Sequence, residues 1–270
     1  MGITLTAELV RLFVKTQGPI PFAESMIMKR VMGSLAVCAA MVLSAASVAW
    51  SADKEDEIKR VNNAATVLTE IMNTPDKSIP DNVMKDARCV AVIPSMVKAA
   101  FVFGGNYGKG VASCHNANGW SAPAPILLGG GSWGLQIGGE AVDLVLLIMN
   151  DQGMENLLNS KFKIGADASA AAGPVGRHAE GDTDWKMKAQ VLTYSRARGL
   201  FAGVSLNGAV LKQDEDDSRA LYGKDVSFQS ILKGKVPPPQ GSTSFLAALK
   251  KFSAQAQTAS NEPHSQPVQR

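Results

Sequence analysis

Two arginines, Arg196 and Arg198, stand two residues apart immediately before an apolar segment over residues 200–211. Residues two apart on a β-strand project from the same face, so both guanidinium groups could flank one phosphate group, which arginine grips with two hydrogen bonds. Three lysines are further candidates for the same chemistry: Lys98, Lys109 and Lys212. The alternative for each cation is a solvated position or an ion pair with Asp143, an acid within an apolar run that needs a partner if it is buried.

Residues for metal or nucleophilic catalysis follow no recognisable pattern. The three histidines and three cysteines lack the spacing of a metal site. The run 129–134 lacks the lysine of a P-loop, and no G-x-S-x-G motif occurs. Glu140 and Asp143 are offset by three, which puts them on opposite faces of a strand. Ser195 and Ser205 would be the nucleophiles of a hydrolase, yet neither has an evident histidine and acid partner. We therefore expect a protein that is not an enzyme and that uses neither a metal nor another cofactor.

The first 49 residues have the organisation of an upstream extension followed by a secretory signal. Met28-Lys29-Arg30 forms a basic start, residues 31–43 form an apolar core, and Ser47-Val48-Ala49 supplies small residues for cleavage. A retained anchor is the alternative, although the apolar core is short for a membrane span. Cys38 resembles the cysteine of a lipoprotein cleavage box, but the apolar run continues beyond it. The sequence thus predicts a signal peptide over residues 28–49 and export to the periplasm or cell envelope.

The charge balance argues against a nucleic acid as partner. The whole chain has 27 Lys and Arg residues against 24 Asp and Glu residues. Residues 1–49 contain four of these cations and two of these anions, so the remainder carries 23 against 22. Domains that bind nucleic acids usually carry a strongly basic surface. Any binding of an anionic partner must therefore be local.

Cys89 and Cys114 are the two cysteines that remain after the predicted signal. Both lie in strand-like segments that flank the segment 101–105, and export to an oxidising compartment permits them to pair. We expect one disulfide between them. Two buried, reduced thiols are the alternative.

The apolar patterning predicts an α+β domain over residues 50–235. A helix over 53–73 carries an apolar stripe, and its acidic first turn favours packing on the domain core over lying on a membrane. Short strands follow from residue 89 onward, and the run 104–108 is predicted as a hairpin turn. Two similar glycine-rich segments, each followed by a strand and a helix, indicate a single domain with a mainly antiparallel, barrel-like sheet flanked by short helices.

A linker, a helix and a tail are predicted after residue 235. Residues 236–243 are rich in Pro, Gly and Ser, as in linkers. A helix beginning at Ser244 places four apolar side chains on one side: Phe245, Leu246, Leu249 and Phe252. Within the segment 244–270 this helix is a candidate for insertion into a membrane surface, and docking onto the domain is the alternative. Residues 254–270 are polar and predicted to be disordered.

Several motifs in a fixed order connect the chain to a known family. They are Ile93-Pro94, the run 101–110, the segment 129–140, Asp143 and the stretch 194–211 with both arginines. Together they resemble the SYLF domain family, and the resemblance covers roughly residues 56–235. It implies binding of phospholipids and, in fungal and animal members, links to phosphoinositides and actin.

These observations predict a non-enzymatic, exported protein that binds anionic phospholipid or a membrane surface in the cell envelope. Head-group phosphate would lie on Arg196 and Arg198, and the C-terminal helix would insert its apolar side. An exported bacterial protein would meet neither actin nor phosphoinositides, so these ligands of the eukaryotic members are not expected. The alternative is a structural or protein-interaction module that binds another envelope protein.

Overall fold

The computed structural model describes nine stretches of the chain: residues 53–75, 78–100, 103–133, 138–159, 161–175, 189–197, 200–201, 206 and 208–261. The upstream extension and the predicted signal peptide over residues 28–49 lie outside these stretches, as do Arg198, Ser205 and the end of the predicted tail.

Strands in the described stretches form one sheet of ten, comprising β1 (Cys89–Ala100), β2 (Phe103–Asn116), β3 (Gly119–Trp120), β4 (Ala124–Trp133), β5 (Gly138–Ile148), β6 (Lys161–Lys163), β7 (Ala170–Ala172), β8 (Val191–Ala197), β9 (Leu200–Phe201) and β10 (Val210–Gln213). Eight of them follow the order β6-β10-β4-β2-β1-β5-β8-β7, with β3 beside β2 and β9 beside β8. The strands pair antiparallel, except that β7 is parallel to β8. The predicted α+β class with a mainly antiparallel sheet is confirmed.

Chain connectivity requires this sheet to curl. The strands β6 and β7 end the eight-strand path on opposite sides, yet only residues 164–169 separate them in the sequence. Seven peptide steps reach at most about 25 Å, whereas seven spacings between strands in a flat sheet amount to about 34 Å. The two edges must therefore approach each other, which gives the predicted barrel-like curvature.

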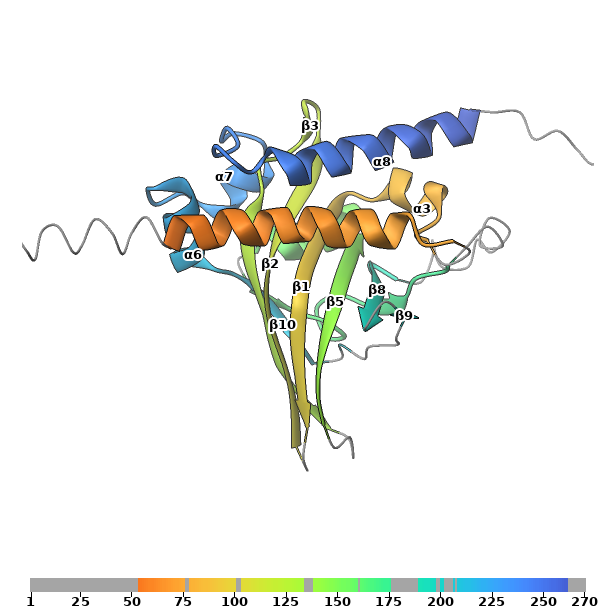
Figure 1. Ribbon diagram of the computed structural model, residues 1–270, viewed down its shortest axis with the longest axis vertical. Helices are drawn as coiled ribbons and strands as arrows, with labels where there is room; N and C mark the ends of the chain where they lie inside the picture. Colours follow the sequence, from red (N-terminus) through yellow and green to blue (C-terminus); the bar gives the residue numbers. More distant parts are fainter. Residues whose placement is uncertain are drawn as a thin grey trace, which may run out of the picture. The chain divides into compact units, whose positions relative to one another are not determined.

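Helices cover the sheet on both faces. They are a helix over residues 53–72, α3 (Asp81–Asp86), α4 (Asp151–Leu158), α6 (Glu215–Tyr222), α7 (Phe228–Leu232) and α8 (Thr243–Asn261). The 53–72 helix and α8 lie across the strands on the same side, in orange and dark blue in Figure 1. Asp214 caps the start of α6, and Gly223 ends it in the left-handed conformation with φ 69°.

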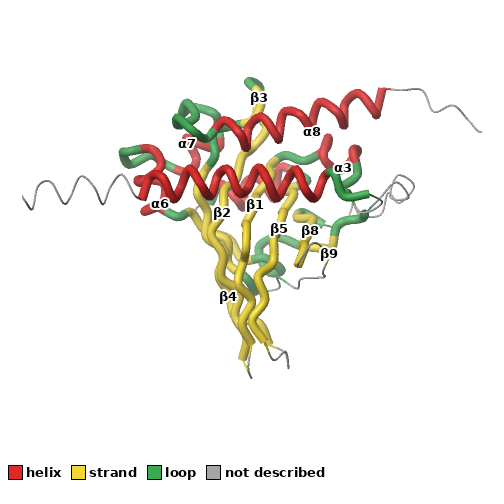
Figure 2. The backbone as a smooth tube through the Cα atoms, in the orientation of Figure 1, coloured by secondary structure: helices red, strands yellow, loops and turns green. Residues whose placement is uncertain are grey.

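β1 shows why both faces need cover. Its side chains alternate between two apolar cores. Cys89, Ala91 and Ile93 belong to the core inside the curl, which includes residues of α4 and α7. Val90 and Val92 belong to the outer core, which includes residues of the 53–72 helix, α3 and α8. The strands continue beyond these helices, and their far ends carry no helix (Figure 2).

An irregularity interrupts the pairing of β1 with β2. The pairing register shifts between Val92 and Val97, and Ser95 has a positive φ of 50°. The backbone of β2 comes very close there: a Cβ added at Gly110 would stand 2.1 Å from the carbonyl oxygen of Val92. Only glycine fits at this position.

Three predicted elements differ in the structure. The run 104–108 is part of β2 and not a hairpin turn. The apolar segment 200–211 is not one strand, since β9 and β10 lie near opposite edges of the sheet. Part of the tail predicted to be disordered is helical, because α8 extends to Asn261. The apolar side of α8, including Phe252, packs on the outer core. This packing stabilises the helix, which therefore continues into residues whose polar sequence predicted disorder.

The predicted disulfide between Cys89 and Cys114 is present. The two residues are direct partners in the antiparallel pairing of β1 with β2. It joins the ends of these strands that lie under the helices, inside the inner core.

Candidate functional site

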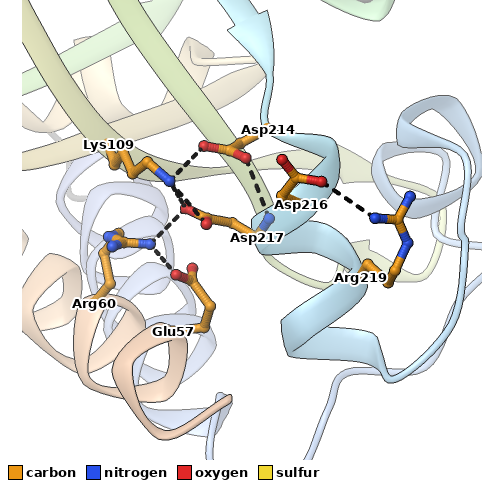
Figure 3. Close-up of polar contacts among 7 residues, drawn as sticks. All are labelled: Glu57, Arg60, Lys109, Asp214, Asp216, Asp217 and Arg219. Carbon is orange, nitrogen blue, oxygen red and sulfur yellow. Dashed lines mark hydrogen bonds and ion pairs between the residues drawn. The ribbon is translucent and has the colours of Figure 1, made fainter. Parts of the chain in front are cut away.

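A cluster of five charged side chains joins three elements (Figure 3). The Lys109 ammonium from β2 lies 3.0 Å from Asp214 and 2.8 Å from Asp217, at the start of α6. Arg60 from the 53–72 helix lies 2.7 Å from the same Asp217 carboxylate and also binds Glu57. We call these residues the charge cluster. Ion pairs among its three acids and two bases connect the 53–72 helix to β2 and α6.

Electrostatics inside the charge cluster follow from burial. Glu57 is 3% exposed, and its burial raises its pKa to about 7 against the opposing charge of Arg60. One of its carboxylate oxygens has no hydrogen-bond partner within the described stretches. Burial disfavours the charge on Lys109, but its hydrogen bonds to Asp217 and Asp214 outweigh this and raise its pKa. The Lys109 ammonium is thus occupied by carboxylates and not offered to a phosphate.

Arg196, the described member of the predicted arginine pair, is also held by acids. It binds Glu70 of the 53–72 helix, and its Nη2 lies 3.3 Å from an oxygen of Asp143 on β5. The other oxygen of Asp143 accepts a hydrogen bond of 2.9 Å from the Ser95 amide. The Arg196 side chain is only 14% exposed. Asp143 is therefore paired, as predicted, and Arg196 fastens the helix to the sheet. Arg198 lies outside the described residues.

The remaining predicted site residues are widely separated. Lys98 is the pairing partner of the buried Asn106, on the inner face of the sheet. Lys212 is exposed on β10. The four apolar residues of α8 are buried in the outer core: Phe245, Leu246, Leu249 and Phe252. Their packing against the domain accounts for the apolar stripe of α8, so in this structure they are not presented to a membrane.

A row of uncovered residues crosses the outer face of the sheet beyond the helices. Direct pairing partners on six neighbouring strands form it: Lys163, Val210, Gly129, Tyr107, Val97 and Ala141. None of them is buried; Val97 is 50% and Tyr107 53% exposed. We call this row the open strand face. A large aromatic and a β-branched side chain side by side on an exposed surface are typical of a contact surface.

A hollow borders the open strand face towards the helices. Its volume is about 560 Å³. Its lining consists of the Lys109–Asp214 pair and six further residues: Tyr107, Leu127, Lys212, Gln213, Glu215 and Asp216. We call this hollow the notch. The notch is thus lined by two of the lysines that the sequence predicted as phosphate ligands, Lys109 and Lys212.

Sequence reasoning missed the two central residues of the open strand face. Val97 and Tyr107 are isolated apolar residues in segments interpreted as a connection and as a turn. Their pairing across β1 and β2 places them side by side. The useful signal would have been a tyrosine, one of only three in the chain, within a glycine-rich run that can continue as a strand.

Metal-binding groups and membrane-spanning helices are not found in the described part of the chain. No group of three or more His, Cys, Asp or Glu side chains there is arranged to hold a metal ion. No helix among these residues is both long and apolar enough to cross a membrane.

The fold and the site define a single α+β domain whose curled sheet keeps part of one face open. Residues 129–252 match the family described as "Ysc84: Las17-binding protein actin regulator". The chain belongs to this family, which is the SYLF domain family that the sequence motifs resemble.

Relatives in eukaryotes agree with this assignment. The chain is 34% identical to the SH3 domain-containing YSC84-like protein 1 of Rattus norvegicus over 76% of this chain and 61% of that protein. The human protein of the same name is 34% identical over 73% and 59%. LAS seventeen-binding protein 3 of Saccharomyces cerevisiae is 34% identical over 61% of this chain and 36% of its own length. The chain spans about three fifths of the length of the mammalian relatives.

Proposed function

We propose that the protein is a non-enzymatic binding protein of the cell envelope whose open strand face rests on an anionic phospholipid membrane. The observation that carries this proposal is the open strand face itself, where half-exposed apolar side chains lie beside lysines. Such a surface suits the boundary between lipid head groups and acyl chains.

Apolar contact would come from Val97 and Tyr107. Neither is covered by a helix, and both stand in the middle of the row. A tyrosine ring is amphipathic, and tyrosine is enriched where membranes meet water. Removing these side chains from water on a membrane would add a favourable hydrophobic contribution.

Electrostatic attraction would come from the β6–β10 edge. Lys163 and Lys212 are exposed there, and no ion pair of theirs occurs within the described residues. Each lysine near an anionic membrane surface contributes about 1 kcal/mol. This assignment moves the head-group contact from Arg196, which two carboxylates occupy, to the lysines at the edge of the sheet.

Envelope location is supported by two features. The segment 28–49 has the composition of a secretory signal. The disulfide between Cys89 and Cys114 suits an oxidising compartment.

A protein partner is the second candidate. The matched family is described as Las17-binding, and the yeast relative is named for the same binding. The open strand face would then be the docking surface for another protein of the envelope, and a lipid would not be required.

Co-sedimentation with vesicles tests the proposal. The protein should bind anionic phosphatidylglycerol vesicles more strongly than phosphatidylcholine vesicles, and less strongly at high salt. Lys163→Gln should weaken binding about five-fold, the equivalent of about 1 kcal/mol. Lys250→Gln removes one exposed charge from α8 and should leave binding unchanged. Binding to neither vesicle, together with saturable association with a second envelope protein, would favour the protein partner.

A further inference from the structure

The sheet next to the notch carries no side chain at one position. Gly129 stands between Tyr107 and Val210 in the open strand face. A Cβ added at Gly129 would meet no atom within 4 Å. Tyr107, the pairing partner of Gly129, lines the notch together with Glu215 and Asp216 from the first turn of α6, and the notch has a volume of about 560 Å³. Pockets of this size bind small ligands in other proteins.

The notch offers one available charge of each sign. Lys109 and Asp214 neutralise each other at 3.0 Å, and Asp216 lies 3.2 Å from Arg219. Lys212 and Glu215 are exposed, and neither has an ion pair among the described residues. Both line the notch together with the ring of Tyr107.

This charge arrangement selects a dipolar ligand. A purely anionic group would meet Glu215 and Asp216, and a purely cationic group would meet Lys212, so each would be attracted at one point and repelled at another. A ligand with both charges satisfies both sides. Lysine binds a phosphate as a compact charge, while a carboxylate and an aromatic ring together attract an ammonium group.

We propose that the notch binds the head group of a zwitterionic phospholipid, with its phosphate at Lys212 and its ammonium group at Glu215 and Tyr107. This inference rests on the proposed function in one respect: the membrane must lie on the open strand face. Tyr107 belongs to both the open strand face and the notch. A lipid held by its head group in the notch therefore lies at the place where the domain meets the membrane.

Soluble glycerophosphoethanolamine is the direct probe, titrated into the protein and followed by calorimetry or by NMR. Saturable binding is expected. Gly129→Val adds a side chain next to Tyr107, which lines the notch, without removing a charge, and should abolish the binding. Glu215→Gln should weaken it about ten-fold, as expected for one charged hydrogen bond. Glu155→Gln, an exposed acid on α4, is the matched control and should bind like the wild type.

A charge swap tests the dipolar character. Glu215→Lys alone should lose the ligand, because the notch would then offer two cations outside its ion pairs, at positions 212 and 215, and no such acid. Glu215→Lys combined with Lys212→Glu should recover part of the affinity, since the ligand can bind in the opposite direction. Equal loss in the single and double variants would overturn the dipolar assignment, provided that thermal unfolding shows both to be folded.

Vesicles separate this inference from the proposed function. Phosphatidylethanolamine added to anionic vesicles should strengthen binding of the wild type but not of Gly129→Val. Anionic vesicle binding without saturable head-group binding would overturn the notch assignment and leave the proposed function standing. If the soluble probe binds but phosphatidylethanolamine in vesicles has no effect, the ligand of the notch is not a membrane lipid, and the proposal is overturned. Binding of neither probe nor vesicle would overturn both proposals.

Discussion

Glu57 should lower the free energy of unfolding of the wild-type protein as the pH rises, and replacing Glu57 by glutamine should remove this loss. Burial raises the pKa of Glu57 from 4.5 to about 7, although the charge of Arg60 acts in the opposite direction. Between these values the folded protein holds a proton at Glu57 that the unfolded chain has released. The folded state then binds more protons than the unfolded state, so the free energy of unfolding falls as the pH rises through this window.

The magnitude follows from the two pKa values. The difference between 4.5 and about 7 corresponds to about 3 kcal/mol, at about 1.4 kcal/mol for each pH unit. An amide at position 57 cannot ionise. The stability of Glu57→Gln relative to the wild type should therefore rise by ~3 kcal/mol between pH 4 and pH 8.

Urea unfolding at a series of pH values from about 4 to 8, without reductant, measures this difference. Folding also changes the pKa of other acids, such as Asp214. Their contributions to the pH dependence are similar in the wild type and the variant, so they largely cancel in the difference between the two proteins. The control is Glu55→Gln, an exposed acid on the same helix, for which the difference should stay constant with pH. A constant difference for Glu57→Gln, or one that falls with pH, would refute the account of the charge cluster.

Four further variants test the fold. Gly110→Ala should destabilise the protein by about 1–3 kcal/mol or more, because its Cβ would stand 2.1 Å from a backbone oxygen of β1. Gly129→Ala, whose Cβ meets no atom within 4 Å, should cost less than about 1 kcal/mol. Equal losses of thermal stability in Gly110→Ala and Gly129→Ala would contradict the close approach of β2 to β1 at Gly110. Phe252→Ala should cost about 3–5 kcal/mol because the ring is 2% exposed; a cost below about 1 kcal/mol in urea unfolding would show that α8 is not docked. Cys89→Ser combined with Cys114→Ser should cost about 2–4 kcal/mol, and mass spectrometry after alkylation of the denatured, unreduced wild type should find neither thiol labelled.

Local patterns were sufficient for much of the fold. The apolar stripe of the 53–72 helix predicted a helix on the core, and the acid Asp143 within an apolar run predicted a paired carboxylate. Both are present, and the ion pair of Asp143 with Arg196 is partly buried. The disulfide was predicted because the two cysteines lie in strand-like segments on either side of the segment 101–105 and because export permits pairing; it is present. These features depend on residues near one another in the sequence or on a strict physical requirement for a partner.

Long-range features could not be predicted in the same way. Whether the run 104–108 turns or continues as a strand depends on its pairing with β1 and β4, because glycine permits both. The open strand face is a row across six strands whose residues extend from Val97 to Val210 in the sequence, so no single local motif marks it. Arg196 stood out as a phosphate ligand, but the sequence could not show that Glu70 would reach it from the 53–72 helix.

Photo-cross-linking at position 107 tests the central claim most directly. A benzoyl-phenylalanine replacing Tyr107 would stand in the middle of the open strand face, and the same group replacing Lys250 would stand exposed on α8. On anionic vesicles, irradiation should join lipid to the protein at position 107 and not at position 250. Lipid attachment at position 250 alone, or at neither position while the protein is bound to the vesicles, would contradict the assignment of the open strand face as the membrane contact.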